Sequence, residues 1–114
     1  MQAVSSAGGH AEEQAARFLA ARGMKIIERN YRCRGGEIDL ICREGATLVF
    51  VEVRLRTHRG FGGAAASITP AKQRRIALAA RHYLAGKPLP VCRFDAVLLD
   101  GAAIDWIRNA FDAA

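Results

Sequence analysis

The stretch GEIDLICREGATLVFVEVRLR, residues 36–56, contains two runs in which every second side chain is apolar, while the side chains between them are of mixed type. Successive side chains of a β-strand point to opposite faces of the sheet, so each run has two distinct faces. One face is purely apolar in both runs, with Ile38, Leu40 and Cys42 in Glu37–Arg43 and Val49, Val51, Val53 and Leu55 in Thr47–Arg56. The stretch therefore predicts two neighbouring strands that share an apolar face.

The turn between these strands decides which side chains lie opposite one another. Glu44 and Gly45 have the composition of a two-residue hairpin loop. This loop predicts that Arg43 pairs with Ala46, Asp39 with Phe50, and Glu37 with Glu52. The register unites the two apolar faces, whereas a slip of one residue would place carboxylates beside valines.

The other face of the two strands then gathers the carboxylates of Glu37, Asp39 and Glu52. Like charges that lie opposite each other destabilise a sheet. Three arrangements relieve the repulsion: exposure of the face to water, pairing with Arg54 or another cation, or a bound divalent metal. Two or three carboxylates converging on one ion suit magnesium or manganese, which prefer oxygen ligands.

Helical periodicity from about Ala11 to Arg22 places Glu12 on the side of a helix that faces the sheet. One interpretation makes Glu12 a first-turn acid that complements the helix dipole. The other makes it a further carboxylate of the metal site, because a carboxylate that faces inward needs a partner. The sequence leaves both open.

The rest of the chain completes a single α/β domain, residues 1–114, whose residues 1–10 we expect to be flexible. The further predicted elements are a strand from Met24 to Arg29, a helix from cap Thr69 and Pro70 to about Ala85, and a strand from Val91 to Leu99. The element order is α-β-β-β-α-β, and a helix between two strands favours a parallel crossover. We expect a mixed sheet flanked by helices, with Trp106 and Phe111 packed onto its core.

The composition favours a polyanionic partner, because the 114 residues carry a formal charge of +6, mostly from arginine. The cations beyond the acidic strand and on the second helix are Arg56, His58, Arg59, Lys72, Arg74, Arg75 and Arg81. They either follow a phosphate backbone, with Arg56, Arg59, Lys72 and Arg75 as the predicted nucleic-acid contacts, or are ordinary solvated charges.

The three cysteines lack zinc-ligand spacing, and no run approaches the roughly 18 apolar residues of a membrane span. We therefore expect a cytoplasmic protein with reduced thiols and no membrane partner.

GEIDLI (Gly36–Ile41) and VFVEVRLR (Val49–Arg56) resemble motifs of the YraN-like uncharacterised family of bacterial proteins. The resemblance covers nearly the whole chain. It extends to Glu12, Arg29-Asn30, FGGAAAS at 61–67, Lys72, RFD at 93–95, Trp106-Ile107 and Ala110-Phe111. That family resembles a branch of the PD-(D/E)xK nuclease superfamily, close to Holliday-junction resolvases, and this implies a restriction-endonuclease-like core.

The resemblance implies a metal site of Glu12, Asp39 and Glu52 that holds Mg²⁺ or Mn²⁺, and a catalytic set of Asp39, Glu52 and Arg54. Arg54 stands where the superfamily usually has lysine. Arginine stays protonated and cannot act as a base, although it can stabilise charge on a phosphate. Its other role would be the counter-ion of Glu52.

These features predict a metal-dependent endonuclease that hydrolyses phosphodiester bonds in DNA, with branched or damaged DNA as the substrate implied by the resemblance. A non-catalytic nucleic-acid-binding module that retains the fold is the alternative, and a protein-interaction adaptor is a third hypothesis. Symmetric cutting of a junction would call for a homodimer.

Overall fold

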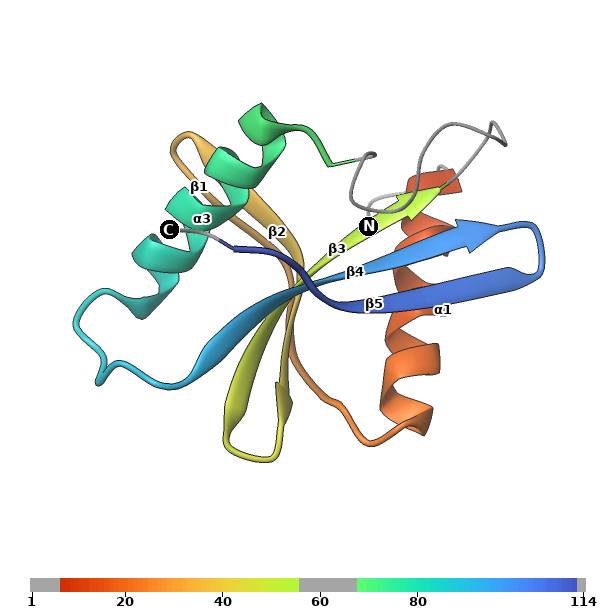
Figure 1. The fold of residues 1–114 in the computed structure, drawn as a ribbon, viewed down its shortest axis with the longest axis horizontal. Coiled ribbons are helices and arrows are strands. Elements are labelled where there is room, and N and C mark those ends of the chain that lie inside the picture. The colour runs from red at the N-terminus through yellow and green to blue at the C-terminus, as the bar shows by residue number, and fades with distance from the viewer. Residues whose placement is uncertain (1–6, 56–67, 113–114) are drawn as a thin grey trace, which may run out of the picture.

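The computed structural model describes residues 7–55 and 68–112, which form one five-stranded sheet and two helices (Figure 1). The elements are α1 (Ala7–Ala21), β1 (Lys25–Cys33), β2 (Gly36–Glu44), β3 (Thr47–Leu55), α3 (Pro70–Leu84), β4 (Cys92–Asp100) and β5 (Ala103–Phe111). The predicted order of helix, three strands, helix and strand is confirmed. Of residues 1–10, which we expected to be flexible, 1–6 lie outside the described part of the chain.

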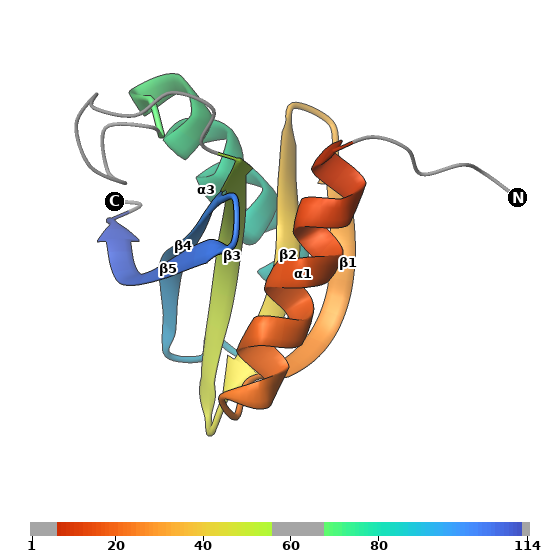
Figure 2. The same cartoon turned by 90° about the vertical axis from the view of Figure 1, so that its right-hand side faces the viewer.

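The sheet has the order β1-β2-β3-β4-β5 and is mixed, as predicted. Only the β3–β4 pair is parallel, because α3 carries the chain from one to the other; the remaining neighbours are antiparallel. Figure 2 shows α1 and α3 on opposite faces of the sheet. Within the described ranges, neither helix is long and apolar enough to cross a bilayer.

Each helix covers one half of the core. Leu19 of α1 packs with Leu40 and Val51, which belong to the apolar face predicted for β2 and β3. Ile76 of α3 packs with Phe50 on the opposite face. The three-layer arrangement therefore buries both faces of the central strands.

The C-terminal tail forms a strand that the sequence did not predict. β5 pairs antiparallel with β4 and lies at the edge of the sheet. Its alternation is weak because Asp105, Arg108 and Asn109 interrupt the apolar positions. The prediction that Trp106 and Phe111 pack onto the core is confirmed.

The predicted register of the β2–β3 hairpin was wrong by two residues. Gly45 and Ala46 form the turn, so Glu44 pairs with Thr47; the further pairs are Arg43 with Leu48, Ile41 with Phe50 and Leu40 with Val51. Gly45 has φ +61°, so the turn places glycine first rather than second, as type II′ turns do. A shift of two residues keeps every side chain on its predicted face. It removes the predicted Glu37–Glu52 and Asp39–Phe50 pairs.

The sheet divides where β2 and β3 stop pairing. Their paired residues end at Leu40 and Val51. β2 continues beside β1 as far as Gly36, while β3 continues beside β4 as far as Leu55. Figure 1 shows the two strands diverging upward from their hairpin. We call this opening the fork; Asp39 and Glu52 are the first residues beyond the last pair.

Gly36 sets how closely α3 approaches β2. A Cβ atom at this position would lie 2.4 Å from the carbonyl oxygen of Arg75 and 3.0 Å from the main-chain nitrogen of Ala79. Both contacts are with the backbone of α3, so no change of side-chain rotamer relieves them. Glycine at the start of GEID therefore allows the helix to lie against the strand.

We predict that Gly36→Ala lowers the free energy of unfolding by about 1–3 kcal/mol, because the added methyl group must push α3 away from β2. Urea unfolding followed by circular dichroism measures this loss. Adding Ala79→Gly should not restore stability, since the closest contact is with the Arg75 carbonyl oxygen. Stability within about 0.5 kcal/mol of wild type would show that α3 does not depend on this close approach.

Candidate active site at the fork of the sheet

Asp39 stands at the inner end of the fork and joins its two sides. Its Oδ2 accepts a hydrogen bond of 2.8 Å from the main-chain nitrogen of Val53. A backbone N–H that loses its strand partner needs another acceptor. The Asp39 carboxylate supplies that acceptor, and the bond holds it beside β3.

Glu52 is the acid of β3 at the same level, and its side chain is only 3% exposed. Its Oε1 has no hydrogen-bond partner among the described residues. Its Oε2 lies 3.6 Å from Nη1 of Arg54 and 3.7 Å from Nζ of Lys72, which are ion-pair distances. Burial, followed by the charge of Asp39, raises the pKa of Glu52 to about 8 against the opposing effect of Lys72 and Arg54.

A second buried acid shows what full compensation looks like in this protein. Asp95 is completely buried. It accepts hydrogen bonds from the Arg93 guanidinium, from Nε1 of Trp106 and from the main-chain nitrogen of Asn109. Its partners are those of a structural acid, which the sequence analysis did not identify. Among the described residues Glu52 has no equivalent set of short hydrogen bonds, since its two ion-pair contacts are 3.6 and 3.7 Å long and its Oε1 has no hydrogen-bond partner.

Glu12 reaches the fork from α1. The helix begins at Ala7 and has no acidic residue in its first turn, so the helix-dipole interpretation of Glu12 was wrong. Burial and then the charge of Asp39 raise the pKa of Glu12, while a hydrogen bond with the Asn30 side chain lowers it. Asn30 has φ +52°, a left-handed conformation that asparagine accepts more readily than most residues.

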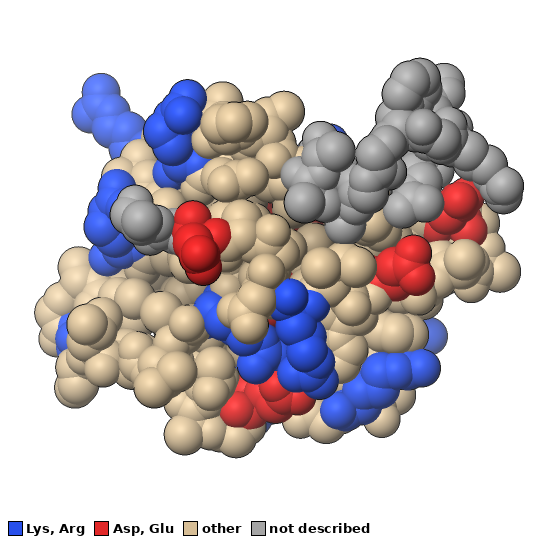
Figure 3. Space-filling view, in the orientation of Figure 1, with Lys and Arg blue, Asp and Glu red and all other residues tan. Residues whose placement is uncertain are grey.

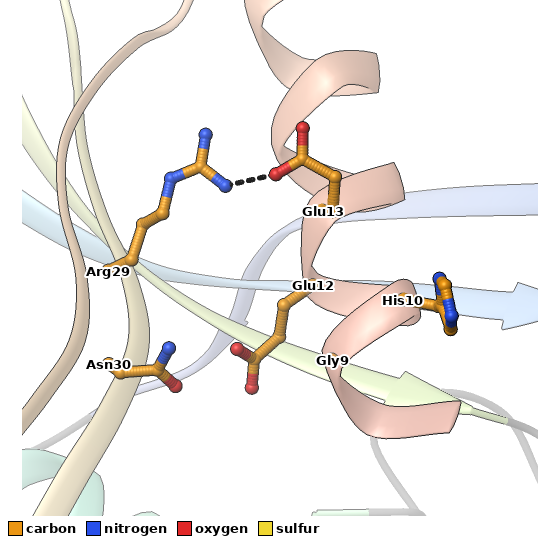
Figure 4. Close-up of a pocket in the computed structure, with 6 residues that line it drawn as sticks. All are labelled: Gly9, His10, Glu12, Glu13, Arg29 and Asn30. Carbon is orange, nitrogen blue, oxygen red and sulfur yellow. Dashed lines mark hydrogen bonds and ion pairs between the residues drawn. The ribbon is translucent and has the colours of Figure 1, made fainter. Parts of the chain in front are cut away.

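A cavity of about 360 Å³ opens beside Glu12, lined by Gly9, His10, Glu12, Glu13, Arg29 and Asn30. Figure 4 shows the Glu12 carboxylate turned toward the side of Asn30, while Glu13 turns away from it to Arg29. The two adjacent acids of α1 therefore have different surroundings. Glu13 has cationic partners, whose hydrogen bonds lower its pKa, whereas Glu12 faces Asp39.

Glu37 holds the N-terminal part of α3. Its Oε2 accepts a 3.0 Å hydrogen bond from Nζ of Lys72, and its Oε1 lies 3.8 Å from Nη2 of Arg75. The hydrogen bond from Lys72 is the main reason that the pKa of Glu37 is lowered. The sequence placed Lys72 and Arg75 on a nucleic-acid surface but did not predict that Lys72 reaches the carboxylates.

The donors at the fork fit a hard divalent cation. They are carboxylate oxygens, one of them buried without a partner, and two of the acids have a raised pKa. The three-carboxylate site predicted from Glu12, Asp39 and Glu52 is not assembled, because no three His, Cys, Asp or Glu side chains in the described ranges are placed to hold one ion. Glu12 and Glu52 each lie near Asp39 instead. Two carboxylates suffice for magnesium, which keeps several waters.

α3 provides a basic surface beside the fork. Arg74, Arg75 and Arg81 are exposed, and the helix contains no acidic residue. Figure 3 shows blue side chains over the part of the molecule formed by α3 and the β1–β2 hairpin, with further blue side chains in the lower centre and at the lower right of the same face. The predicted contacts Arg56 and Arg59 lie outside the described residues.

Fold and site together define an α/β protein with a group of carboxylates at the fork of a mixed sheet. Hydrogen bonds and cations of the described residues balance the negative charge of this group only in part. The chain belongs to the uncharacterised protein family UPF0102, whose sequence profile matches residues 11–99. This confirms the resemblance to the YraN-like family.

Relatives from several bacteria match almost the whole chain. A UPF0102 protein of Dechloromonas aromatica is 61% identical over 106 residues, which cover 93% of this chain and 88% of that protein. One of Nitrosospira multiformis is 60% identical, with 92% of each chain covered. One of Aeromonas hydrophila is 56% identical, with 93% of this chain and 85% of that protein covered.

We predict that Glu52→Gln stabilises the metal-free protein by about 1–3 kcal/mol near pH 8, because it removes a buried charge. The folded state holds the Glu52 proton up to a pKa of about 8, whereas the unfolded state releases it near 4.5. Wild type therefore loses stability relative to the variant as pH rises through this window.

Urea unfolding in chelator between pH 4.5 and 8 measures this difference. Asp95→Asn serves as the matched control and should destabilise by about 3–5 kcal/mol, since it breaks the ion pair of the buried carboxylate with Arg93 and replaces one acceptor oxygen with an amide nitrogen that faces N–H donors. A pH-independent difference between wild type and Glu52→Gln would show that the Glu52 pKa is not raised.

Proposed function

We propose that this protein is a Mg²⁺- or Mn²⁺-dependent endonuclease that hydrolyses phosphodiester bonds of DNA at the fork. One observation carries the proposal: Glu52 is buried beside Asp39, and one of its oxygens has no hydrogen-bond partner in the described part of the chain. A protein gains no stability from such a group. A bound divalent cation would supply the missing partner and leave coordination positions for a phosphate oxygen.

Asp39 and Glu52 would hold the metal, with Glu12 adjoining Asp39. A divalent ion bound there would lower the pKa of a bound water and would stabilise charge on the scissile phosphate. The hydrogen bond from Val53 orients the Asp39 carboxylate before substrate arrives. Arg54 remains a cation throughout; its contact with Glu52 and its 41% exposure suit it to hold a phosphate oxygen rather than to remove a proton.

The exposed arginines of α3 would bind the DNA backbone on either side of the reacting phosphate. Such contacts position a duplex without reading its sequence. Branched or damaged DNA is the substrate class that the family resemblance suggests, and symmetric cutting of a four-way junction would require a two-fold homodimer. The proposed activity would be cytoplasmic, because bacterial DNA lies in the cytoplasm.

A non-catalytic nucleic-acid-binding module is the second candidate function. Arg54 favours it, because arginine occupies the position at which the resembled superfamily usually has lysine. In that case the basic face of α3 would bind nucleic acid while the fork retained a bound ion without hydrolysis.

We predict that the purified protein with Mn²⁺ cleaves at least one of duplex, single-stranded, flapped and four-way DNA. Asp39→Asn and Glu52→Gln should each slow cleavage at least ~100-fold, because they remove metal ligands. Glu13→Gln is the matched control and should cleave at the wild-type rate, since Glu13 pairs with Arg17 and Arg29 away from Asp39. Circular dichroism checks that each variant is folded.

Failure to cleave any of these substrates, combined with salt-dependent binding, would replace the nuclease with the binding module. Failure to bind DNA even at low salt would leave the protein-interaction adaptor.

A further inference from the structure

Lys72 lies in the first turn of α3 and projects its ammonium group to the fork. Thr69 caps this turn, and its Oγ1 accepts a 3.1 Å hydrogen bond from the main-chain nitrogen of Lys72. The Lys72 side chain is 19% exposed, and its Nζ stands between Glu37 of β2 and Glu52 of β3. One lysine from the helix layer therefore contacts both sides of the divided sheet.

The Lys72 ammonium is not saturated by these acids. It carries three N–H donors, and its hydrogen bond to Glu37 uses one of them. The second acid, Glu52, lies 3.7 Å away, beyond ordinary hydrogen-bond length. As far as the described residues go, donors therefore remain for an oxygen that enters the fork, while Glu37 keeps the lysine in place.

Arg54 approaches the same oxygen of Glu52 from within β3, but its surroundings differ. Its side chain is 41% exposed, about twice the exposure of Lys72, and its contact with Glu52 is 3.6 Å long. Electrostatic stabilisation is strongest where water is excluded and the charge is held in advance. Both conditions favour Lys72 over Arg54.

We propose that Lys72 is a catalytic residue of the nuclease. Its ammonium, held by Glu37, contacts a non-bridging oxygen of the scissile phosphate on the side where it faces Glu52 in the free protein. Glu37 is the positioning residue, and Arg54 serves as counter-ion of Glu52 and as a backbone contact. This inference rests on the proposed DNA hydrolysis and names the cation that the reaction uses.

The reaction remains a simple hydrolysis. The oxygen of a water forms a bond to phosphorus, the bond from phosphorus to the leaving deoxyribose oxygen breaks, and a proton from the water passes to solvent while the leaving oxygen takes one up. Lys72 neither gives nor takes a proton. It offsets the charge that accumulates on the phosphate oxygens in the transition state.

The first test does not depend on cleavage. DNA binding is measured in chelator as a function of salt for wild type, Lys72→Ala and Lys25→Ala. Lys25 is an exposed lysine at the start of β1, near the closed end of the β2–β3 hairpin. Removing one phosphate contact should reduce the slope of log K against log salt by about one for Lys72→Ala and leave it unchanged for Lys25→Ala.

The second test separates chemistry from binding. Under single turnover with Mn²⁺, we expect Lys72→Ala to cleave ~100-fold or more slowly, since that is the usual cost of losing one charge-stabilising donor. Arg54→Ala should cost about tenfold or less. Lys72→Arg retains a cation and is the control for loss of folding in Lys72→Ala. It should restore the salt slope and recover cleavage only in part.

The outcomes distinguish the two proposals. An unchanged salt slope for Lys72→Ala, or cleavage as fast as that of Lys25→Ala, overturns the role of Lys72 while leaving the nuclease intact. A reduced slope for Lys72→Ala, when the wild-type protein cleaves nothing, overturns the nuclease and with it the catalytic role of Lys72, but keeps the phosphate contact. Absence of DNA binding at low salt overturns both.

Discussion

The hydrogen bond from the Val53 nitrogen to the Asp39 carboxylate, 2.8 Å long, stands where a continuous sheet would place a main-chain acceptor. β2 and β3 pair only as far as Leu40 and Val51, and their separation leaves backbone groups that need partners. A side chain that meets this need is held by the fold itself. The fork is therefore the constraint from which the position of the acids follows.

The acids of the sheet differ in how fully their negative charge is compensated by hydrogen-bond donors and cations. Asp95 has a full set of donors and Glu37 a lysine, whereas Glu12 and Glu52 keep a raised pKa beside Asp39. Burying a carboxylate without partners costs stability. The protein tolerates this cost where β2, β3, α1 and the first turn of α3 meet, and departures from the packing rules of a fold are typical of functional sites.

Alternation in residues 36–56 predicted the strands and their faces correctly, because burial on a pleated sheet depends on parity. It could not decide the register, since Gly45 suits either central position of a turn and a shift of two residues preserves parity. The fork was also hidden, because a strand reads the same whether its neighbour pairs with it or not. Lys72 reaches the acids only because α3 lies against Gly36, and that distance is a property of packing. β5 escaped prediction because polar residues interrupt an edge strand.

The central claim is that Asp39 and Glu52 form a cation site, and a calorimetric titration of Mn²⁺ into wild type and Asp39→Asn tests it most directly. We predict saturable binding to wild type that strengthens between pH 6 and pH 8, as Glu52 loses its proton. We also predict loss of that binding in Asp39→Asn and its retention in Glu13→Gln. Equal binding by wild type and Asp39→Asn, or none by either, would contradict the claim.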